Sequence, residues 1–432
     1  MNEQKSKVCP ECNGKYKGHW CKPCNSTHFK NDFYKWTSGN DMINKFIQDT
    51  QLNADYYKVL EWIPYDRFQE IKQISKGGYG TVYYAMWIDG TIDEWDFKNQ
   101  RWERLGQVEV VLKKFDGIID INEDFLNEMA ILLRTDLGTI STSIFGITKD
   151  TETHEYVMVL AYYKGGSLRN YLNNDFNNIN WENKLFHLKD LANKFSKIHK
   201  LDIVHRDFHP GNILKHEPGH YSNICISDFG LSKLFTENIK NTQKNTIFGV
   251  LPYMAPEVLI REEYKKAADV YSFAFVAYEI ITGILPYHDV SHDKDLAFKI
   301  CNGFRPKIPF HTPRLITQII IRCWDARIMH RPTFKELKKE LGKYYWEYCN
   351  NNNDNNKEIT IQIREAEKFS KNQTSTTPKN YKIHPQAFYT SRLLKFSNLP
   401  KPKNEENFEK KLEELTESFY QINISEGDDD NN

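Results

Sequence analysis

The chain has 432 residues, 40% of them apolar, and its 58 Lys and Arg residues balance its 58 Asp and Glu residues. This neutral net charge gives no indication of a nucleic-acid partner, and we expect none. The polar start MNEQKSKVCP lacks the apolar core of a secretory signal. The longest nearly apolar stretch, residues 270–285, is too short to span a bilayer and contains Glu279. We therefore expect no membrane partner and a cytoplasmic location, with a nuclear one also open.

The first region, residues 1–35, contains two CxxC pairs, formed by Cys9 with Cys12 and by Cys21 with Cys24. Each pair places two thiolates on one side of a tight turn, and four such soft ligands complete the tetrahedral shell that Zn²⁺ prefers. A closed shell leaves no open coordination position, so the predicted zinc is structural, in a small zinc-ribbon-like segment. Redox-active cysteines are the alternative interpretation.

The rest of the chain divides into three regions. Residues 36–62 are predicted to form a connector with a helix over 42–52. Residues 63–345 begin with the apolar alternation of strands, at 68–75, 81–88, 108–115 and 156–163. Longer helical patterns follow, such as residues 181–200. This order predicts an α+β fold, with a strand-rich lobe followed by a helical lobe.

The last region, residues 346–432, begins with an asparagine-rich linker and contains few long apolar runs. Such a composition cannot bury enough apolar surface to hold a fixed structure, so we expect a mostly disordered tail. Residues 403–420 are the exception, because their pattern allows a charged helix.

Two features in the strand-rich part indicate phosphate binding. Residues 75–80, SKGGYG, form a glycine-rich turn whose backbone N–H groups can approach phosphate oxygens closely. Lys113 ends the strand-like run VVLK, and Glu128 follows 15 residues later in a helical pattern, so a carboxylate is available to orient the lysine. An ordinary turn and two solvated surface charges are the alternatives.

Residues 87–108 lengthen the connection between the second and third predicted strands. We expect Trp87, Trp95 and Trp102 to pack within an extended hairpin there. A surface for a partner protein is the alternative.

The polar loop His205-Arg206-Asp207-Phe208-His209-Pro210-Gly211-Asn212 contains a carboxylate and an amide five residues apart. A carboxylate in this position can accept a proton from a hydroxyl, while the amide oxygen can bind a metal ion. Asp228, in Asp228-Phe229-Gly230, is a second hard oxygen ligand of the kind that Mg²⁺ prefers.

The order H-R-D-x-x-x-x-N, D-F-G and then Ala255-Pro256-Glu257 resembles the eukaryotic protein kinase superfamily over residues 63–345. The resemblance implies catalytic roles for Lys113, Glu128 and Asp207, with Asn212 and Asp228 holding Mg²⁺ or Mn²⁺. It further implies an ATP-binding set comprising Ser75, Lys76, Gly77, Gly78, Tyr79, Gly80, Val82, Val111, Lys113, Leu160, Ala161, Tyr163, Asn212 and Asp228.

The resemblance also assigns structural roles. Asp269 would brace the catalytic loop, and Arg331 would pair with Glu257. Arg206 would bind a phosphate on the activation segment. The candidate acceptors are Ser232, Thr236, Thr242 and Thr246, of which Thr246 is preferred.

Three functional readings follow. The favoured one is a Ser/Thr-directed member of the tyrosine-kinase-like group that acts on protein substrates under upstream activators. A tyrosine-directed kinase is the alternative specificity within this first class. The second class is a pseudokinase scaffold that binds nucleotide. Ser75 in place of a glycine and Val250 in place of a threonine are departures from the family pattern. A zinc-centred binding module with a secondary kinase domain is the third class.

Overall fold

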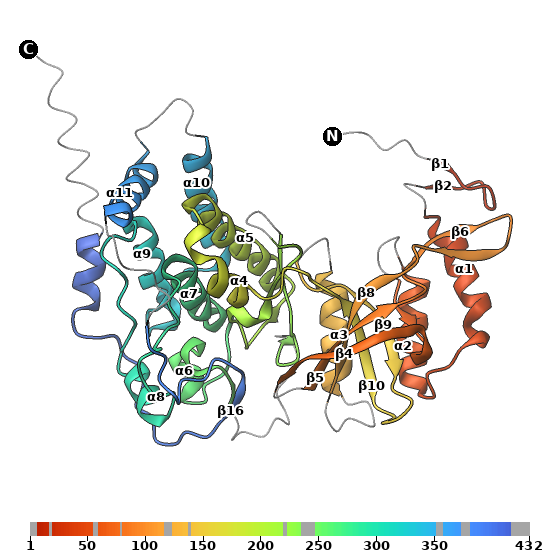
Figure 1. The fold of residues 1–432 in the computed structure, drawn as a ribbon, viewed down its shortest axis with the longest axis horizontal. Coiled ribbons are helices and arrows are strands. Elements are labelled where there is room, and N and C mark those ends of the chain that lie inside the picture. Colours follow the sequence, from red (N-terminus) through yellow and green to blue (C-terminus); the bar gives the residue numbers. More distant parts are fainter. Residues whose placement is uncertain are drawn as a thin grey trace, which may run out of the picture. The chain divides into compact units, whose positions relative to one another are not determined.

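The computed structural model divides the chain into two compact units, Met1–Tyr163 and Lys164–Asn432 (Figure 1). Strands dominate the first unit and helices the second, which confirms the α+β class and the succession of a strand-rich and a helical lobe. The structure describes residues 7–16, 20–54, 59–77, 80–115, 123–136, 140–218, 223–234, 247–350, 357–372 and 381–415.

A six-stranded sheet forms the centre of the first unit, in the order β3-β9-β10-β8-β5-β4. Four strands lie where the apolar alternation predicts them, whereas β3 and β9 are additional. A core of apolar side chains, including Trp87, Val110 and Val159, packs on this sheet. The strands are β3 (Glu61–Trp62), β4 (Phe68–Gly77), β5 (Gly80–Trp87), β8 (Val108–Lys114), β9 (Ile144–Lys149) and β10 (Tyr156–Ala161).

The helix α3 (Glu123–Thr135) contains the predicted pattern after the third strand. Phe125, Met129 and Leu132 lie four and three residues apart and are buried, so one face of the helix packs inward. Glu128 lies three residues after Phe125 and four before Leu132, so it is on the same buried face of the helix.

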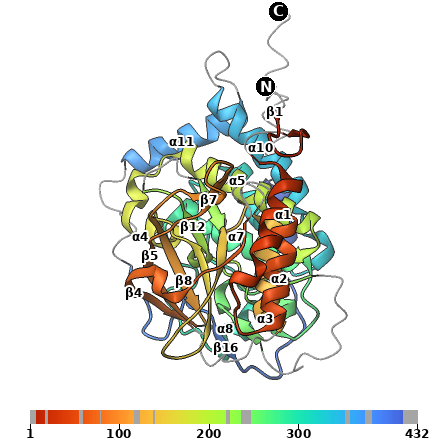
Figure 2. The same cartoon turned by 90° about the vertical axis from the view of Figure 1, so that its right-hand side faces the viewer.

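The amino-terminal elements belong to the same compact unit as the sheet. The short strands β1 (Lys7–Val8) and β2 (Lys15–Tyr16) form a hairpin, which is followed by α1 (Lys22–Asp32) and α2 (Asp41–Leu52). Figure 2 shows α1 and α2 side by side. The Asn40 side chain caps α2 by accepting from the N–H groups of Met42 and Ile43. The predicted connector helix is therefore present, and it packs against α1 of the four-cysteine segment.

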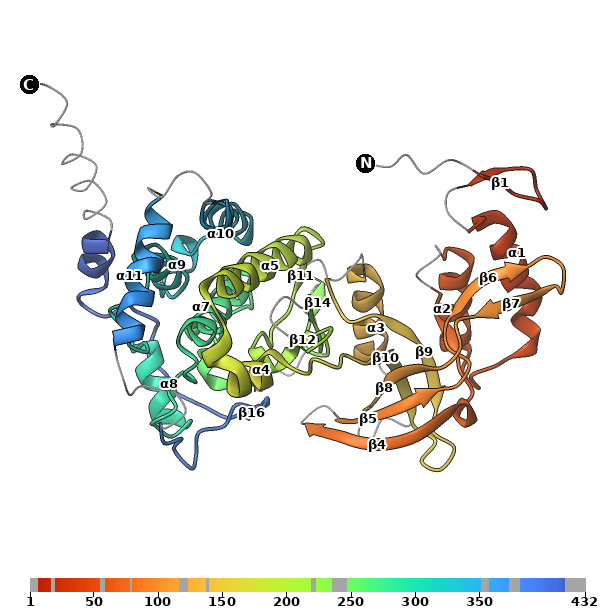
Figure 3. The same cartoon turned by 45° about the horizontal axis from the view of Figure 1, so that its top comes forward.

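An extended hairpin of β6 (Ile92–Asp96) and β7 (Arg101–Arg104) is present as predicted, with Trp95 opposite Trp102. It lies beside α1 and α2 (Figure 3). The Trp102 ring stacks on Phe29 at 4.3 Å and on Trp20 at 5.6 Å between centroids. The third tryptophan differs from the prediction: Trp87 lies in β5 and packs in the sheet core instead, because its inward position on the strand buries it.

Replacing Trp102 by Ala should loosen α1 from the hairpin, because both aromatic stacks are lost. Large aromatic truncations cost about 3–5 kcal/mol in full cores, and Trp102 is half-buried, so we expect about 2 kcal/mol. Hydrogen exchange of the α1 amides should accelerate accordingly. Tyr34→Ala is the matched control, because that ring is 83% exposed; equal protection in both variants would contradict the packing role.

The second unit is built around α7 (Lys266–Thr282), which is buried along nearly its whole length. This helix contains most of the apolar stretch of residues 270–285 and lies in the core. Among the described helices, none has both the length and the hydropathy of a membrane span. The other helices are α4 (Leu168–Asp175), α5 (Trp181–Lys200), α6 (Pro256–Leu259), α8 (Lys294–Cys301), α9 (Arg314–Cys323), α10 (Phe334–Cys349) and α11 (Glu358–Asn372).

The carboxyl-terminal tail has more described structure than its composition predicts. It includes α11, the strand β16 (Arg392–Leu394) and a helical segment over residues 408–415, which lies within the charged helix expected at 403–420. The strand β16 pairs with β15 (Ile247–Gly249) of the same unit. In Figure 1 the blue part of the tail that contains β16 runs past α8. Contacts with the helical unit hold these residues, which lack a core of their own.

Candidate functional site

The loop that contains Asp207 is held in shape by one buried carboxylate. Asp269, in the first turn of α7, accepts hydrogen bonds from the backbone N–H groups of His205 at 3.0 Å and Arg206 at 3.2 Å. The bond from Tyr264 Oη, at 2.9 Å, adds to these. Arg206 has a φ of 71°, a left-handed conformation that such bonds can hold. The bracing role predicted for Asp269 is confirmed by this geometry.

Asp269 stays ionised in this position. Complete burial alone would raise its pKa, but the bond from His199 and the backbone donors outweigh burial and lower it. The opposite holds for His205, whose pKa falls because burial disfavours the charged ring. The loop is thus fixed by a charged carboxylate next to a neutral imidazole.

Asp207 and Asn212 lie next to each other within this loop. Asn212 Nδ2 donates to the backbone oxygen of Asp207 at 3.0 Å and to its Oδ2 at 3.3 Å. Both bonds use the amide nitrogen, which orients Oδ1 of Asn212 as the oxygen for a cation. The Asp207 carboxylate is 6% exposed and is therefore positioned rather than freely rotating.

A short hairpin after Asn212 brings the backbone next to Asp228 close to Asn212. The strand β12 (Ile213–Lys215) starts directly after Asn212 and pairs antiparallel with β13 (Ile224–Ile226). Ser227, between β13 and Asp228, donates its backbone N–H to the Asn212 oxygen at 2.9 Å. The two predicted metal ligands thus stand at one end of a short hairpin, and hard oxygens in this arrangement suit Mg²⁺.

In the first unit the predicted ion pair is present. Lys113 Nζ, on β8, lies 2.6 Å from Glu128 Oε1 on α3, with 10% and 1% of the side chains exposed. A surface-charge reading of these two residues is excluded by that burial. The carboxylate holds the ammonium group in a defined direction.

The sheet register places the predicted apolar nucleotide contacts on the same face as Lys113. Val82 pairs with Lys113, and Leu160 pairs with Val111, two residues before the lysine. Residues opposite each other in a ladder, or two apart along a strand, project from the same face. The strand β10 then ends at Ala161, and Tyr163 is the last residue of this unit.

The glycine-rich turn joins β4 to β5. Ser75, Lys76 and Gly77 pair with Val82, Thr81 and Gly80, whereas Gly78 and Tyr79 lie outside the described residues. Gly80 has a φ of 138°, and a Cβ there would lie 1.9 Å from the Lys114 carbonyl oxygen. Glycine at position 80 is therefore required by the sheet itself.

The structural pair Glu257–Arg331 is also present. The two guanidinium nitrogens lie 2.6 Å and 2.8 Å from the two carboxylate oxygens, and both side chains are fully buried. Among the activation-segment candidates, Ser232 is buried and donates to the His205 oxygen, so it has a structural position. Thr236, Thr242 and Thr246 lie outside the described residues.

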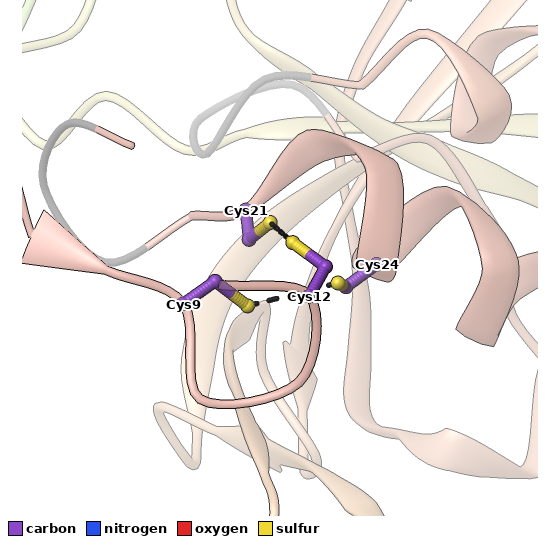
Figure 4. A group of neighbouring side chains, drawn as sticks. All are labelled: Cys9, Cys12, Cys21 and Cys24. Carbon is purple, nitrogen blue, oxygen red and sulfur yellow. Dashed lines mark hydrogen bonds between the residues drawn. The ribbon is translucent and has the colours of Figure 1, made fainter. Parts of the chain in front are cut away.

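The four amino-terminal cysteines converge on one point (Figure 4). Their sulfurs all lie within 4.8 Å of one another, and the pairs Cys9–Cys24 and Cys12–Cys21 are both 3.6 Å apart. Four Zn–S bonds of about 2.3 Å in a tetrahedron separate sulfurs by about 3.8 Å, so the set fits zinc. Cys21 is also the N-cap residue of α1, which couples the cluster to that helix.

Burial opposes the ionisation of three of these thiols, Cys9, Cys21 and Cys24. Burial is the main cause that raises the pKa of Cys21 and Cys24, and neighbouring sulfurs contribute. Burial also opposes ionisation of Cys9, but the backbone N–H groups of Cys12 and Glu11 outweigh it and lower that pKa to about 7. A central dication would favour four thiolates.

Two further residues contact Asp207 that the sequence analysis did not place there. Ser391 Oγ, on the tail, donates to Asp207 Oδ2 at 2.5 Å. His209 Nε2 lies 3.6 Å from the same oxygen and 3.3 Å from Ser391 Oγ. The position of His209 in the loop motif was a signal for its proximity, whereas nothing in the tail sequence distinguishes Ser391.

Residues 68–341 match the family model described as "Protein tyrosine and serine/threonine kinase". A putative serine/threonine-protein kinase/receptor of Acanthamoeba polyphaga mimivirus is 32% identical over 65% of this chain and 16% of its own length. Serine/threonine-protein kinase 12 of Arabidopsis thaliana is 30% identical over 63% of this chain and 55% of its own length.

The dual specificity protein kinase splA of Dictyostelium discoideum is 32% identical over 49% of this chain and 9% of its own length. The chain therefore spans 9% to 55% of the length of these three relatives.

Proposed function

Because the chain belongs to the protein tyrosine and serine/threonine kinase family, we propose that it transfers the γ-phosphate of ATP to Ser and Thr hydroxyls of proteins. The observation that carries the proposal is the buried carboxylate of Asp207, held beside Asn212 in a loop fixed by Asp269. Such a carboxylate orients a hydroxyl and accepts its proton as the bond to phosphorus forms.

The other residues position and neutralise phosphate. Lys113, aimed by Glu128, binds phosphate oxygens of the nucleotide. Asn212 Oδ1 and the Asp228 carboxylate would hold Mg²⁺ or Mn²⁺, and the bound ion would supply positive charge next to the phosphates. Phosphoryl transfer needs mainly this positioning and charge stabilisation, and the chain contains each residue type that the reaction uses. That completeness favours an enzyme over a pseudokinase scaffold.

The names of the mimivirus and Arabidopsis relatives support Ser/Thr specificity. The dual-specificity relative from Dictyostelium keeps tyrosine as the alternative. Two degenerate peptide mixtures, identical except for Ser/Thr or Tyr as acceptor, decide between them. We expect at least about tenfold faster labelling of the Ser/Thr mixture, a difference of about 1.4 kcal/mol in activation free energy. Equal or faster labelling of the Tyr mixture would make the chain tyrosine-directed.

We also propose that Cys9, Cys12, Cys21 and Cys24 hold one structural Zn²⁺. The packing of α1 on α2 and on the β6–β7 hairpin supports a structural role, because the cluster continues into the strand-rich unit. A binding module independent of that unit is correspondingly disfavoured.

Elemental analysis of the purified chain should find about one zinc per molecule. Cys12→Ser should lose the metal and weaken the α1 region, because metal binding and local folding are one equilibrium. Cys349→Ser, which alters a cysteine of α10 outside the cluster, is the matched control and should keep the metal. Zinc-free protein with unchanged α1 hydrogen exchange would contradict the assignment.

A further inference from the structure

The tail from residue 381 to residue 404 lies along the helical unit through a series of specific contacts. At its start, Tyr381 Oη accepts from the Leu285 N–H at 3.1 Å, and the His384 N–H donates to the His288 oxygen at 2.7 Å. At its end, Asn404 Nδ2 donates to Asp325 Oδ1 at 2.8 Å. The segment between these contacts therefore has a defined path over this unit.

A glycine of the helical unit lets the backbone of the tail approach closely. Gly303 has a φ of 93°, and a Cβ there would lie 2.4 Å from the Glu405 backbone nitrogen. Arg169, beside the path, donates to the Tyr389 oxygen at 3.0 Å. The Lys403 N–H donates to the Cys301 oxygen at 2.9 Å. This bond and the Arg169 bond both involve backbone atoms of the tail, so they fix its register rather than only its average position.

In the middle of this path the tail becomes a strand. The strand β16 pairs antiparallel with β15, with Arg392 opposite Gly249 and Leu394 opposite Ile247. Leu394 is 3% exposed, whereas its neighbour Leu393 is 44% exposed, so one side of the strand faces the unit. Adding a strand to an exposed edge is a general way in which proteins bind extended peptides.

The residue directly before this strand is Ser391, whose hydroxyl points at the proposed catalytic carboxylate. Ser391 Oγ donates to Asp207 Oδ2 at 2.5 Å, and the Nε2 atom of His209 lies 3.3 Å from Ser391 Oγ. Packing alone needs no hydroxyl at this carboxylate. The contact is the one that an acceptor serine makes with the group that takes its proton.

We propose that Ser391 is a phosphoacceptor within the same molecule, and that residues 381–404 occupy the surface on which other protein substrates bind; this rests on the proposed kinase function. In the reaction, Ser391 Oγ bonds to the γ-phosphorus of ATP, and the bond from that phosphorus to the β,γ-bridging oxygen breaks. The electron pair leaves with ADP, and the Ser391 proton passes to Asp207 Oδ2.

Phosphorylated Ser391 cannot keep its contact with the Asp207 carboxylate. Phosphoserine carries nearly two negative charges at neutral pH, and the Asp207 carboxylate would face them directly. Like-charge repulsion and desolvation therefore favour release of β16 from β15. The phosphorylation of Ser391 thus opens the surface for an external substrate, and the tail regulates access as well as supplying the first acceptor.

The test uses the full chain incubated with ATP and Mg²⁺, with casein as the external acceptor and mass spectrometry to locate phosphate. We expect phosphate on Ser391 at a rate per molecule that does not change over a hundredfold range of protein concentration. Ser391→Ala should lose that label, whereas Ser397→Ala, an exposed serine six residues further along the tail, should keep it.

A second pair of variants tests the strand. Leu394→Asp should lower Ser391 labelling at least tenfold while casein is still labelled, and Leu393→Asp on the exposed side should label Ser391 normally. Casein labelling without Ser391 phosphate, or a Ser391 rate that rises with protein concentration, would overturn this inference and leave the proposed function standing. Absence of transfer to both acceptors would overturn the two together.

Discussion

Replacing Asp207 by Asn is expected to lower phosphate transfer to casein by about 10³-fold, because general-base assistance typically contributes 10²–10⁴-fold. The amide has the shape of the carboxylate and can still accept from Asn212, so the loop should keep its form. ATP affinity should change by less than about twofold, since Asp207 acts on the acceptor hydroxyl. Steady-state kinetics at saturating ATP, with nucleotide binding measured by calorimetry, checks both expectations.

Asp202→Asn is the matched control for this variant. Asp202 lies five residues upstream and is 56% exposed, where it pairs with Lys266 at the surface. Exposed pairs contribute little, so activity and stability should stay close to the parent values. Comparable activity of Asp207→Asn and Asp202→Asn would remove Asp207 from the catalytic role.

Replacing Arg331 by Met is expected to have the largest effect on stability. It leaves the Glu257 carboxylate, 1% exposed, without its bidentate partner. Breaking a buried ion pair by removing one member typically costs about 3–5 kcal/mol, because the remaining charge stays desolvated. Urea-induced unfolding followed by circular dichroism should show the helical unit unfolding at a clearly lower concentration.

Two comparisons separate this effect from the loss of packing. Lys343→Met, on α10, removes a lysine that is 67% exposed and lies 3.7 Å from Glu347, so it should cost less than about 1 kcal/mol. Adding Glu257→Gln to Arg331→Met should restore part of the stability, because the buried charge is then gone. A double variant no more stable than Arg331→Met would show that the charge is not the cause.

The elements of the proposed catalytic loop were predictable because their chemistry is local in sequence. Asp207 and Asn212 lie five residues apart in one loop, and the helix α5 has the same bounds as its apolar pattern, Trp181 to Lys200. The strands with clear alternation, such as β8, were equally readable. In these places the pattern, the turn chemistry and the final packing all agree.

Elements that depend on distant partners were not predictable. The strand β9 contains Gly146, which weakens its strand pattern; a Cβ there would lie 2.3 Å from the Glu61 oxygen of β3. The glycine makes room for β3, a strand of two residues that has no pattern of its own. Neither feature can be recognised without knowing that the other exists.

The tail shows the same limit more strongly. Ser391 and Asp207 are 184 positions apart, and the composition around Ser391 is that of a polar linker with short apolar pieces. Its order comes from the unit on which it lies, through Leu394, Tyr389 and backbone pairing. Composition indicates whether a segment can fold alone. It does not indicate whether the segment becomes ordered by packing on another part of the chain, as this one does.

Transfer of radiolabelled phosphate from ATP to casein by the full chain with Mg²⁺, beside the Asp207→Asn variant, tests the proposed activity most directly. We expect labelled phosphoserine and phosphothreonine on casein with the parent chain, and about a thousandth of that label with the variant. A chain that binds ATP and labels neither casein nor itself, or a variant as active as its parent, would contradict the proposal.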